Sequence, residues 1–267
     1  MEKPIVFISH ITEEKELAIE LKRIIEDAYL GLMQVFVSSD DDSISTGSKW
    51  LDNISNSLEN CAIELILCSE ASVKRPWINF EAGAGWVRNI PVIPLCHSGM
   101  KKSELPIPIN MLQAVEITSI GDLNLLLPTL SKALGCKIPK VDFNDFIEFA
   151  TEFEERYTTG EKLKGFFELL MSYEENFDFD ILTQMLDAIC DQSVFLERLD
   201  LGVIENEFIT KIKKYITSNG LTDYFELETG SPGTYFMENM SINGCKTSIF
   251  LKDRSIIKKH KKTILCR

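Results

Sequence analysis

The run Ala62-Ile63-Glu64-Leu65-Ile66-Leu67-Cys68 decides the fold class, because it is an almost continuous apolar stretch of the length of a strand. Runs of this kind are typical of strands that are buried on both faces of a sheet. Two similar runs precede it at 5–9 and 34–38, and two follow it at 91–96 and 114–118. These runs predict a sheet of five strands.

Segments with helical periodicity separate the predicted strands. Between Glu14 and Ala28 the apolar residues recur three or four positions apart, and further helices are predicted over 48–60, 77–88 and 123–134. Residues 39–47 are polar and predict a long exposed loop. Strands that alternate with helices are typical of α/β proteins with a parallel sheet. We therefore predict a flavodoxin-like, five-stranded parallel sheet over residues 1–137.

Composition restricts the protein class. The chain has 267 residues and a net charge of −13, which argues against general coating of nucleic acid. Its seven cysteines form no C-x-x-C pair, so we expect a reducing, cytoplasmic environment and no structural zinc. No apolar run approaches the roughly 18 residues that span a bilayer, and no signal peptide is predicted. We expect no membrane partner.

The carboxyl ends of the strands are the expected binding edge, because ligands of open parallel sheets bind there. This rule selects Ser9, His10 and Ile11 after the first strand and residues 38–42 after the second. Neither G-x-G-x-x-G after a strand nor G-x-x-x-x-G-K-[ST] occurs, so phosphates are not bound in either of those ways. We interpret His10 as a polar residue at the rim rather than as a base.

Trp77 and Glu81 lie four residues apart on a predicted helix that enters from the same edge. Residues at this spacing share one helix face. A carboxylate beside an indole can stabilise a flat cation or an oxocarbenium ion. The alternative is a surface glutamate that flanks core aromatics. Gly83 and Gly85, inside the same helix, predict close packing of that helix on the sheet.

A magnesium site is a weaker hypothesis. Asp40, Asp41 and Asp42 follow the second strand, as in receiver domains of similar topology. However, the third strand ends without the matching aspartate, and the fifth lacks the matching lysine. We therefore expect a solvated loop and no metal.

The motifs together resemble the Toll/interleukin-1 receptor (TIR) domain, of the bacterial kind, over residues 1–137. The resemblance rests on motifs in the same order as in that family: Val6–His10, Val35–Ser38 with the loop Ile44–Trp50, Leu65–Ser69, Trp77-x-x-x-Glu81 and Pro91–Pro94.

The resemblance implies an NAD⁺-cleaving site in which Glu81 is catalytic and Trp77 lines the pocket. It implies that NAD⁺ is the substrate and that no cofactor is needed. It also implies that residues 39–50 form the mobile BB loop. Ser9, His10, Ile11, Ser38 and Trp50 match substrate-binding positions. Many relatives carry an acidic residue where this chain has Ser38, and neighbouring Asp40 is expected to take over ribose recognition.

The chemistry is compatible with one carboxylate. Cleavage of the nicotinamide–ribose bond releases a neutral base from a cation, so the leaving group needs no general acid, unlike that of an ordinary glycoside. Water as acceptor gives ADP-ribose, and an internal acceptor gives a cyclic product. The sequence leaves both open.

A second domain is expected over residues 145–267, because the pattern breaks at Pro139 and becomes acidic and aromatic. Helices are predicted over 146–157, 160–173, 180–199 and 206–217, and strands over 224–227 and 248–251 with a turn at Asn243-Gly244. This order favours a mainly helical domain with a winged-helix-like hairpin at its end. We expect it to sense, dock or oligomerise.

The last segment is basic, with eight Lys or Arg and one acid between Lys246 and Arg267. It could bind nucleic-acid phosphates, or be a solvated helix end or an intramolecular partner of the acidic body.

The function expected from the resemblance is that of an NAD⁺ hydrolase, either glycohydrolase or cyclase. It would act as an effector of bacterial anti-phage defence that self-associates through TIR domains and is activated by oligomerisation. The alternatives are a non-enzymatic TIR adaptor and a nucleoside transferase of similar topology, which also uses one glutamate.

Overall fold

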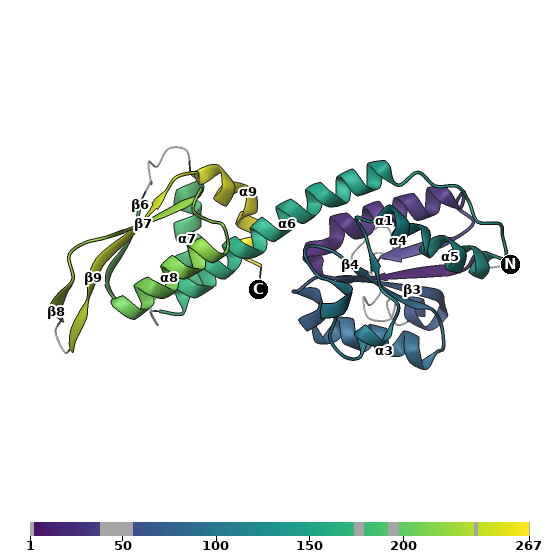
Figure 1. Cartoon of the computed structure of the whole chain (residues 1–267), viewed down its shortest axis with the longest axis horizontal. Helices are drawn as coiled ribbons and strands as arrows, with labels where there is room; N and C mark the ends of the chain where they lie inside the picture. Colours follow the sequence, from purple (N-terminus) through teal and green to yellow (C-terminus); the bar gives the residue numbers. More distant parts are fainter. Residues whose placement is uncertain (1–2, 38–55, 174–178, 192–197, 238–239, 267) are drawn as a thin grey trace. The chain divides into compact units, whose positions relative to one another are not determined.

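The computed structural model describes residues 3–37, 56–173, 179–191, 198–237 and 240–266. It divides into two compact units, Met1–Thr158 and Thr159–Arg267 (Figure 1).

The first unit is built on the predicted five-stranded sheet. Its strands are β1 (Ile5–Ser9), β2 (Gln34–Val37), β3 (Cys61–Cys68), β4 (Val92–Cys96) and β5 (Val115–Glu116). Their order is β2-β1-β3-β4-β5, and each neighbouring pair is parallel. The α/β fold class is therefore confirmed, with β5 shorter than predicted.

Helices cover both faces of this sheet. They are α1 (Lys15–Ala28), α3 (Pro76–Val87), α4 (Ile120–Asn124) and α5 (Leu126–Leu134), with helical residues also at 56–60. Short 3-10 helices lie at Thr12–Glu14, Ser72–Lys74, Lys102–Glu104 and Ile109–Met111. The helix predicted over 123–134 is thus divided between α4 and α5.

Alternate residues of β3 belong to two different hydrophobic cores, one on each face of the sheet. Leu65 and Leu67 share a core with α1 and α5, whereas Ile66 and Cys68 share one with α3. This alternation is the two-residue period of a strand, and it places the side chain of Glu64 on the α3 face.

One long helix, α6 (Asn144–Met171), contains the division between the units at 158/159. The sequence pattern predicts two helices here and a second domain from residue 145. The structure differs because the aromatic residues Phe143, Phe146, Phe153 and Tyr157 pack into the core of the first unit. The aromatic spacing that suggested a new domain instead extends the first core.

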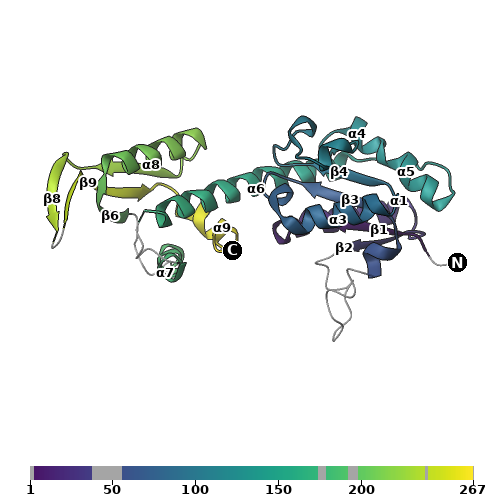
Figure 2. The same cartoon turned by 90° about the horizontal axis from the view of Figure 1, so that it is seen from below.

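The second unit combines helices with a four-stranded sheet (Figure 2). Its elements are α7 (Phe179–Cys190), β6 (Arg198–Glu205), α8 (Asn206–Ser218), β7 (Phe225–Thr229), β8 (Gly233–Met237), β9 (Met240–Leu251) and α9 (Arg254–Ile264). The order is β6-β9-β7, with β8 also paired to β9, and all pairs are antiparallel.

Several predictions for this unit were wrong. The helix predicted to reach residue 199 ends at Cys190, and β6 begins at Arg198. Asn243 and Gly244 form no turn, because both lie within β9 and pair with β8. The two predicted strands, over 224–227 and 248–251, correspond to β7 and β9 and pair antiparallel, but they belong to a larger sheet than predicted. The winged-helix resemblance stays a prediction. In the part of the chain that the structure describes, no helix has the length and apolar character needed to span a bilayer.

Candidate functional site

Glu81 is held inside the first unit by α3 and the end of β1. Proline at the first position of α3 favours helix formation directly before Trp77. Glu81 is only 1% exposed, and its Oε2 accepts a hydrogen bond of 2.6 Å from Ser9 Oγ. The structure therefore brings together the edge residue Ser9 and the helix residue Glu81, as the sequence predicted.

The environment of Glu81 raises its pKa to near neutral pH. Burial raises the pKa of Glu81 to about 7, against the opposing effect of hydrogen bonds from the Ser9 and Trp77 side chains. A group with such a pKa is divided between its protonated and ionised forms at neutral pH. Perturbed acids of this kind are concentrated at functional sites.

Trp77 lies at the surface end of this arrangement. It is 37% exposed, and its ring stacks on Phe80 with centroids 5.2 Å apart. The indole therefore offers an aromatic face near a carboxylate that lies deeper.

His10 and Ile11 are both buried beside Glu14. Burial lowers the pKa of His10 below its ordinary value, and Glu14 only partly opposes this, so the imidazole is neutral at pH 7. The backbone N–H of Ile11 donates to Glu14 Oε2 at 3.2 Å. The side chain of Ile11 belongs to the core beneath α3. The predicted positions Ser38, Asp40 and Trp50, and the whole predicted BB loop, lie outside the described residues.

A buried polar network around Glu14 was not predicted. Glu14 is fully buried, and its Oε1 accepts hydrogen bonds from Ser69 Oγ at 2.7 Å and pairs with His97 Nε2 at 3.1 Å. Ser69 Oγ also lies 3.2 Å from the hydroxyl of Tyr157. The signal was available in part, because Ser69 and His97 directly follow β3 and β4. The network joins the loops that follow β1, β3 and β4.

A second buried carboxyl, Glu64, was also missed. It is fully buried on β3, and both of its oxygens lack a hydrogen-bond partner among the described residues, as does Oε1 of Glu81. Burial, followed by the charge of Glu81, raises the pKa of Glu64 to about 8. A carboxylate in the middle of an apolar strand was the available signal, because unpaired buried charges are costly.

The two glycines of α3 have different environments. A Cβ at Gly85 would lie 2.2 Å from Glu64 Oε2 and 2.6 Å from Val92 Cγ2, which confirms close packing there. A Cβ at Gly83 would meet nothing within 4 Å, so the packing explanation was wrong for Gly83.

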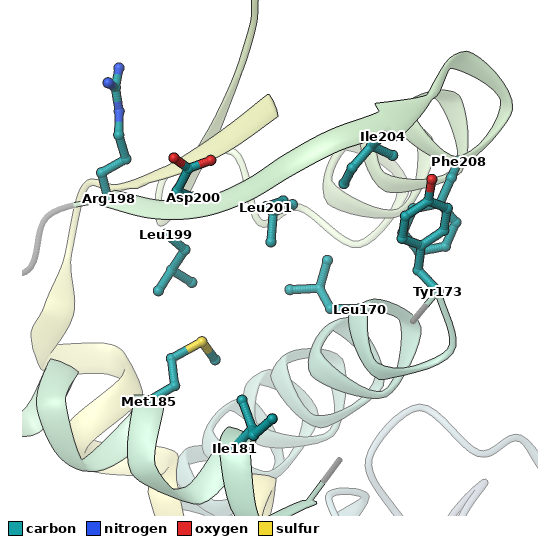
Figure 3. Close-up of a pocket in the computed structure, with 10 residues that line it drawn as sticks. All are labelled: Leu170, Tyr173, Ile181, Met185, Arg198, Leu199, Asp200, Leu201, Ile204 and Phe208. Atoms are coloured by element: carbon teal, nitrogen blue, oxygen red, sulfur yellow. The ribbon is translucent and has the colours of Figure 1, made fainter. Parts of the chain in front are cut away.

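The second unit contains a separate cavity of about 350 Å³. Apolar side chains of α6, α7 and β6 point into it, including Leu170, Met185 and Leu201, whereas Arg198 and Asp200 extend away from it (Figure 3). The pairing of β6 shifts register between Asp200 and Val203, and Gly202 adopts a positive φ of 69° there. This volume and lining suit a small apolar molecule.

The basic C-terminal segment makes contacts within the second unit. Lys252 pairs with Glu226 at 3.2 Å, Lys261 pairs with Asp187, and Arg254 donates to the carbonyl oxygen of Ile189. These contacts favour the intramolecular alternative, and nucleic-acid binding stays a prediction. Within the described ranges, no group of three or more His, Cys, Asp or Glu is placed to hold a metal ion.

Comparison with known proteins finds a family match within the first unit. Residues 6–124 match the model of a family described as TIR domain. A search of curated proteins finds no match. Among solved structures, the chain is similar to a metazoan TIR-STING receptor from C. gigas in complex with 2′,3′-cGAMP, with 13% identity and a TM-score of 0.36. The match covers 76% of this chain and 64% of the receptor chain.

Proposed function

Residues 6–124 form a TIR domain, and from this premise we propose that the chain cleaves the bond between nicotinamide and ribose in NAD⁺. The observation that carries the proposal is the position of Glu81. It is a buried carboxyl at the binding edge of the sheet, bound by Ser9, with a pKa raised to about 7.

In the proposed reaction the C–N bond breaks, and its electron pair neutralises the pyridinium nitrogen of the departing nicotinamide. Positive charge develops on the ribosyl carbon and ring oxygen, and ionised Glu81 stabilises it. A preorganised electrostatic contact of this kind typically lowers a barrier by about 3 to 4 kcal/mol. Attack by water, with loss of a proton, gives ADP-ribose. Attack by an internal nucleophile of the ADP-ribosyl group gives a cyclic product.

The burial of Glu81 supports a requirement for activation. A side chain that is 1% exposed cannot contact a substrate without some opening around it. Trp77, at 37% exposure, is already accessible at the same helix face. We therefore expect a quiet isolated chain and an active self-associated form, in which TIR–TIR contact rearranges the surroundings of Glu81.

In this proposal the second unit controls assembly. Its apolar cavity supports a role in sensing, because a cavity of about 350 Å³ can enclose a small molecule. The biological role that we propose is that of an effector of bacterial anti-phage defence.

The decisive experiment follows NAD⁺ consumption by purified full-length protein, both dilute and crowded to force assembly. Nicotinamide and every adenine-containing product are resolved for wild type, Glu81→Gln and the control Glu70→Gln, whose side chain is exposed near the same edge. We expect loss of NAD⁺ in crowded wild type and control, and almost none in Glu81→Gln.

Other outcomes separate the alternatives. Equal loss of NAD⁺ in all three proteins removes the assignment of Glu81. No loss in any of them favours the non-enzymatic adaptor. Consumption of free nucleosides without NAD⁺ loss favours the nucleoside transferase.

A further inference from the structure

A tight turn follows β4 at the carboxyl edge of the first sheet. The turn covers His97–Met100, and a hydrogen bond of 3.1 Å from the backbone N–H of Met100 to the carbonyl oxygen of His97 closes it. Its two central residues have positive φ, 52° at Ser98 and 88° at Gly99, the sign that a type I′ turn requires. Glycine suits such a position, whereas serine there is strained. Strained residues of this kind are concentrated at functional sites.

The hydroxyl of Ser98 faces a buried imidazole. Ser98 Oγ lies 2.9 Å from His97 Nδ1, and the side chain of His97 is 0% exposed. On the other side of the ring, His97 Nε2 lies 3.1 Å from Oε1 of Glu14. Two hydrogen bonds thus join a hydroxyl, an imidazole and a carboxyl in series. This is the order of groups in the catalytic triad of serine hydrolases, with the two ring nitrogens exchanged.

The contacts of Glu14 determine which ring nitrogen carries the proton. Its Oε1 also accepts a hydrogen bond from Ser69 Oγ at 2.7 Å, and its Oε2 accepts one from the backbone N–H of Ile11 at 3.2 Å. An ionised carboxylate suits several donors, because it is an acceptor only. His97 Nε2 therefore donates to Glu14, and in the neutral ring Nδ1 is the acceptor. The hydroxyl of Ser98 donates to Nδ1, as a nucleophile does to its general base.

The imidazole is held by its surroundings, whereas the hydroxyl is accessible. The ring of His97 contacts the rings of Phe153 and Tyr157, with centroids 6.1 and 5.7 Å away. By contrast, Ser98 is half-buried and Gly99 is exposed. The N–H of Gly99 donates no backbone hydrogen bond in the part of the chain that the structure describes. The N–H that follows a nucleophilic serine is a usual donor to the oxyanion of acyl transfer.

We propose that Ser98, His97 and Glu14 form a second catalytic site, which hydrolyses carboxylic esters of small acyl groups. This site is separate from the proposed cleavage of NAD⁺. Ser98 is the nucleophile, His97 is the general base, and Glu14 orients the imidazole and stabilises its charged form. The acyl group must be small, because a half-buried hydroxyl admits little bulk around it.

The reaction has two steps. In the first, Ser98 Oγ attacks the acyl carbon and its proton passes to His97 Nδ1. The C–O bond of the ester breaks with its electron pair on oxygen, and the departing alkoxide takes the proton from His97 and leaves as an alcohol. In the second, water attacks the acyl-serine and its proton passes to His97. The C–O bond to Ser98 then breaks, the proton returns to Ser98 Oγ, and a carboxylic acid is released.

The test treats native full-length protein with diisopropyl fluorophosphate. Ser98 Oγ attacks the phosphorus, fluoride leaves, and the proton passes to His97. Mass mapping of peptides locates and counts the label over time in wild type, Ser98→Ala and Glu14→Gln. The matched control is Ser103→Ala, because Ser103 is exposed in the 3-10 helix that follows the turn. Release of 4-nitrophenol from 4-nitrophenyl acetate measures turnover of a small ester.

We expect one label per chain on Ser98, in wild type and in Ser103→Ala alike. Ser98→Ala should take up no label and lose the ester hydrolysis that wild type shows. Glu14→Gln should react about 100-fold to 10,000-fold more slowly, because the glutamine amide N–H can face Nε2 and favour the tautomer that has its proton on Nδ1.

Three results would each overturn the proposal: no label on native Ser98, equal labelling rates at Ser98 and Ser103, or a wild-type rate in Glu14→Gln. Protein unfolded in urea gives the intrinsic reactivity, and there Ser98 should react no faster than Ser103. If Glu14→Gln does not fold, native wild type still decides. Ser98 must then react at least about 100-fold faster than Ser103, and a smaller ratio overturns the proposal.

Discussion

The two units bury very different interiors. In the first unit, the layer between β3 and α3 contains two carboxyls, at 0% and 1% exposure, three of whose four oxygens have no hydrogen-bond partner in the described residues. In the second unit, the cavity is lined mainly by apolar side chains, and its charged lining residues Arg198 and Asp200 extend outward. Burial of a carboxyl is costly, whereas burial of a leucine is favourable. The first interior therefore supports the reactive site that we propose, and the second suits packing or an apolar ligand.

The largest effect is expected from Glu81→Gln. Loss of one preorganised electrostatic contact typically costs about 100-fold to 1,000-fold in turnover, so NAD⁺ cleavage by assembled protein should fall by at least that range. Denaturant unfolding should show no loss of stability at pH 8, because the variant removes a buried carboxyl. A variant that is both inactive and strongly destabilised would reduce Glu81 to a structural residue.

Stability should fall as pH rises, in contrast to proteins that are stabilised by ion-paired carboxylates. The folded pKa values of Glu81 and Glu64, about 7 and about 8, lie above the ordinary 4.5. The folded state thus binds more protons than the unfolded state between about pH 4.5 and 8, and stability is greatest at the acidic end. We expect a decrease of about 6 kcal/mol between pH 5 and 8 from the two carboxyls together, since each extra proton held by the folded state contributes about 1.4 kcal/mol per pH unit.

Urea unfolding at several pH values measures this slope. Glu64→Gln and Glu81→Gln should each flatten it, and the exposed control Glu70→Gln should leave it unchanged. A slope that is the same in all four proteins would mean that neither buried carboxyl has a raised pKa.

Replacing each of the two glycines of α3 by alanine tests how tightly the layer between β3 and α3 is packed. Gly85→Ala should destabilise by about 1 to 3 kcal/mol, because the new Cβ meets Glu64 and Val92. Gly83→Ala is the matched control and should stabilise by up to about 1 kcal/mol, because space is free and alanine is the better helix former. Thermal and urea unfolding of both variants measure the difference in stability. Equal effects of the two substitutions would contradict the close packing at Gly85.

The smallest effect is expected at the cavity of the second unit. Leu201→Phe adds apolar volume to the lining and should stabilise by about 0.5 to 1 kcal/mol, the lower range for cavity filling. Leu227→Phe, on β7 and outside the lining, is the control and should not stabilise. Destabilisation by Leu201→Phe would indicate that the cavity is already filled.

Periodicity predicted the first unit well. The apolar runs became β1 to β5, and the rule for strand ends brought Ser9 to Glu81. Prediction was poorer for the second unit, where β6 and β8 were missed. Gly202, with its positive φ, lies at the register shift of β6, and the alternation of exposed and less exposed residues changes phase at Ile204. A bulge of this kind interrupts the alternation on which sequence patterns depend.

The sequence by itself determined the parallel α/β class of the first unit and the placement of Ser9 at a strand end and Glu81 on a helix, because these follow from local periodicity and spacing. Only the tertiary structure decided that Glu64 lies under α3 and that Glu14, Ser69, His97 and Tyr157 form one network. It also decided that the first part of α6 packs into the first core. These contacts join residues far apart in the chain, so they depend on strand order and helix placement, which no local pattern records.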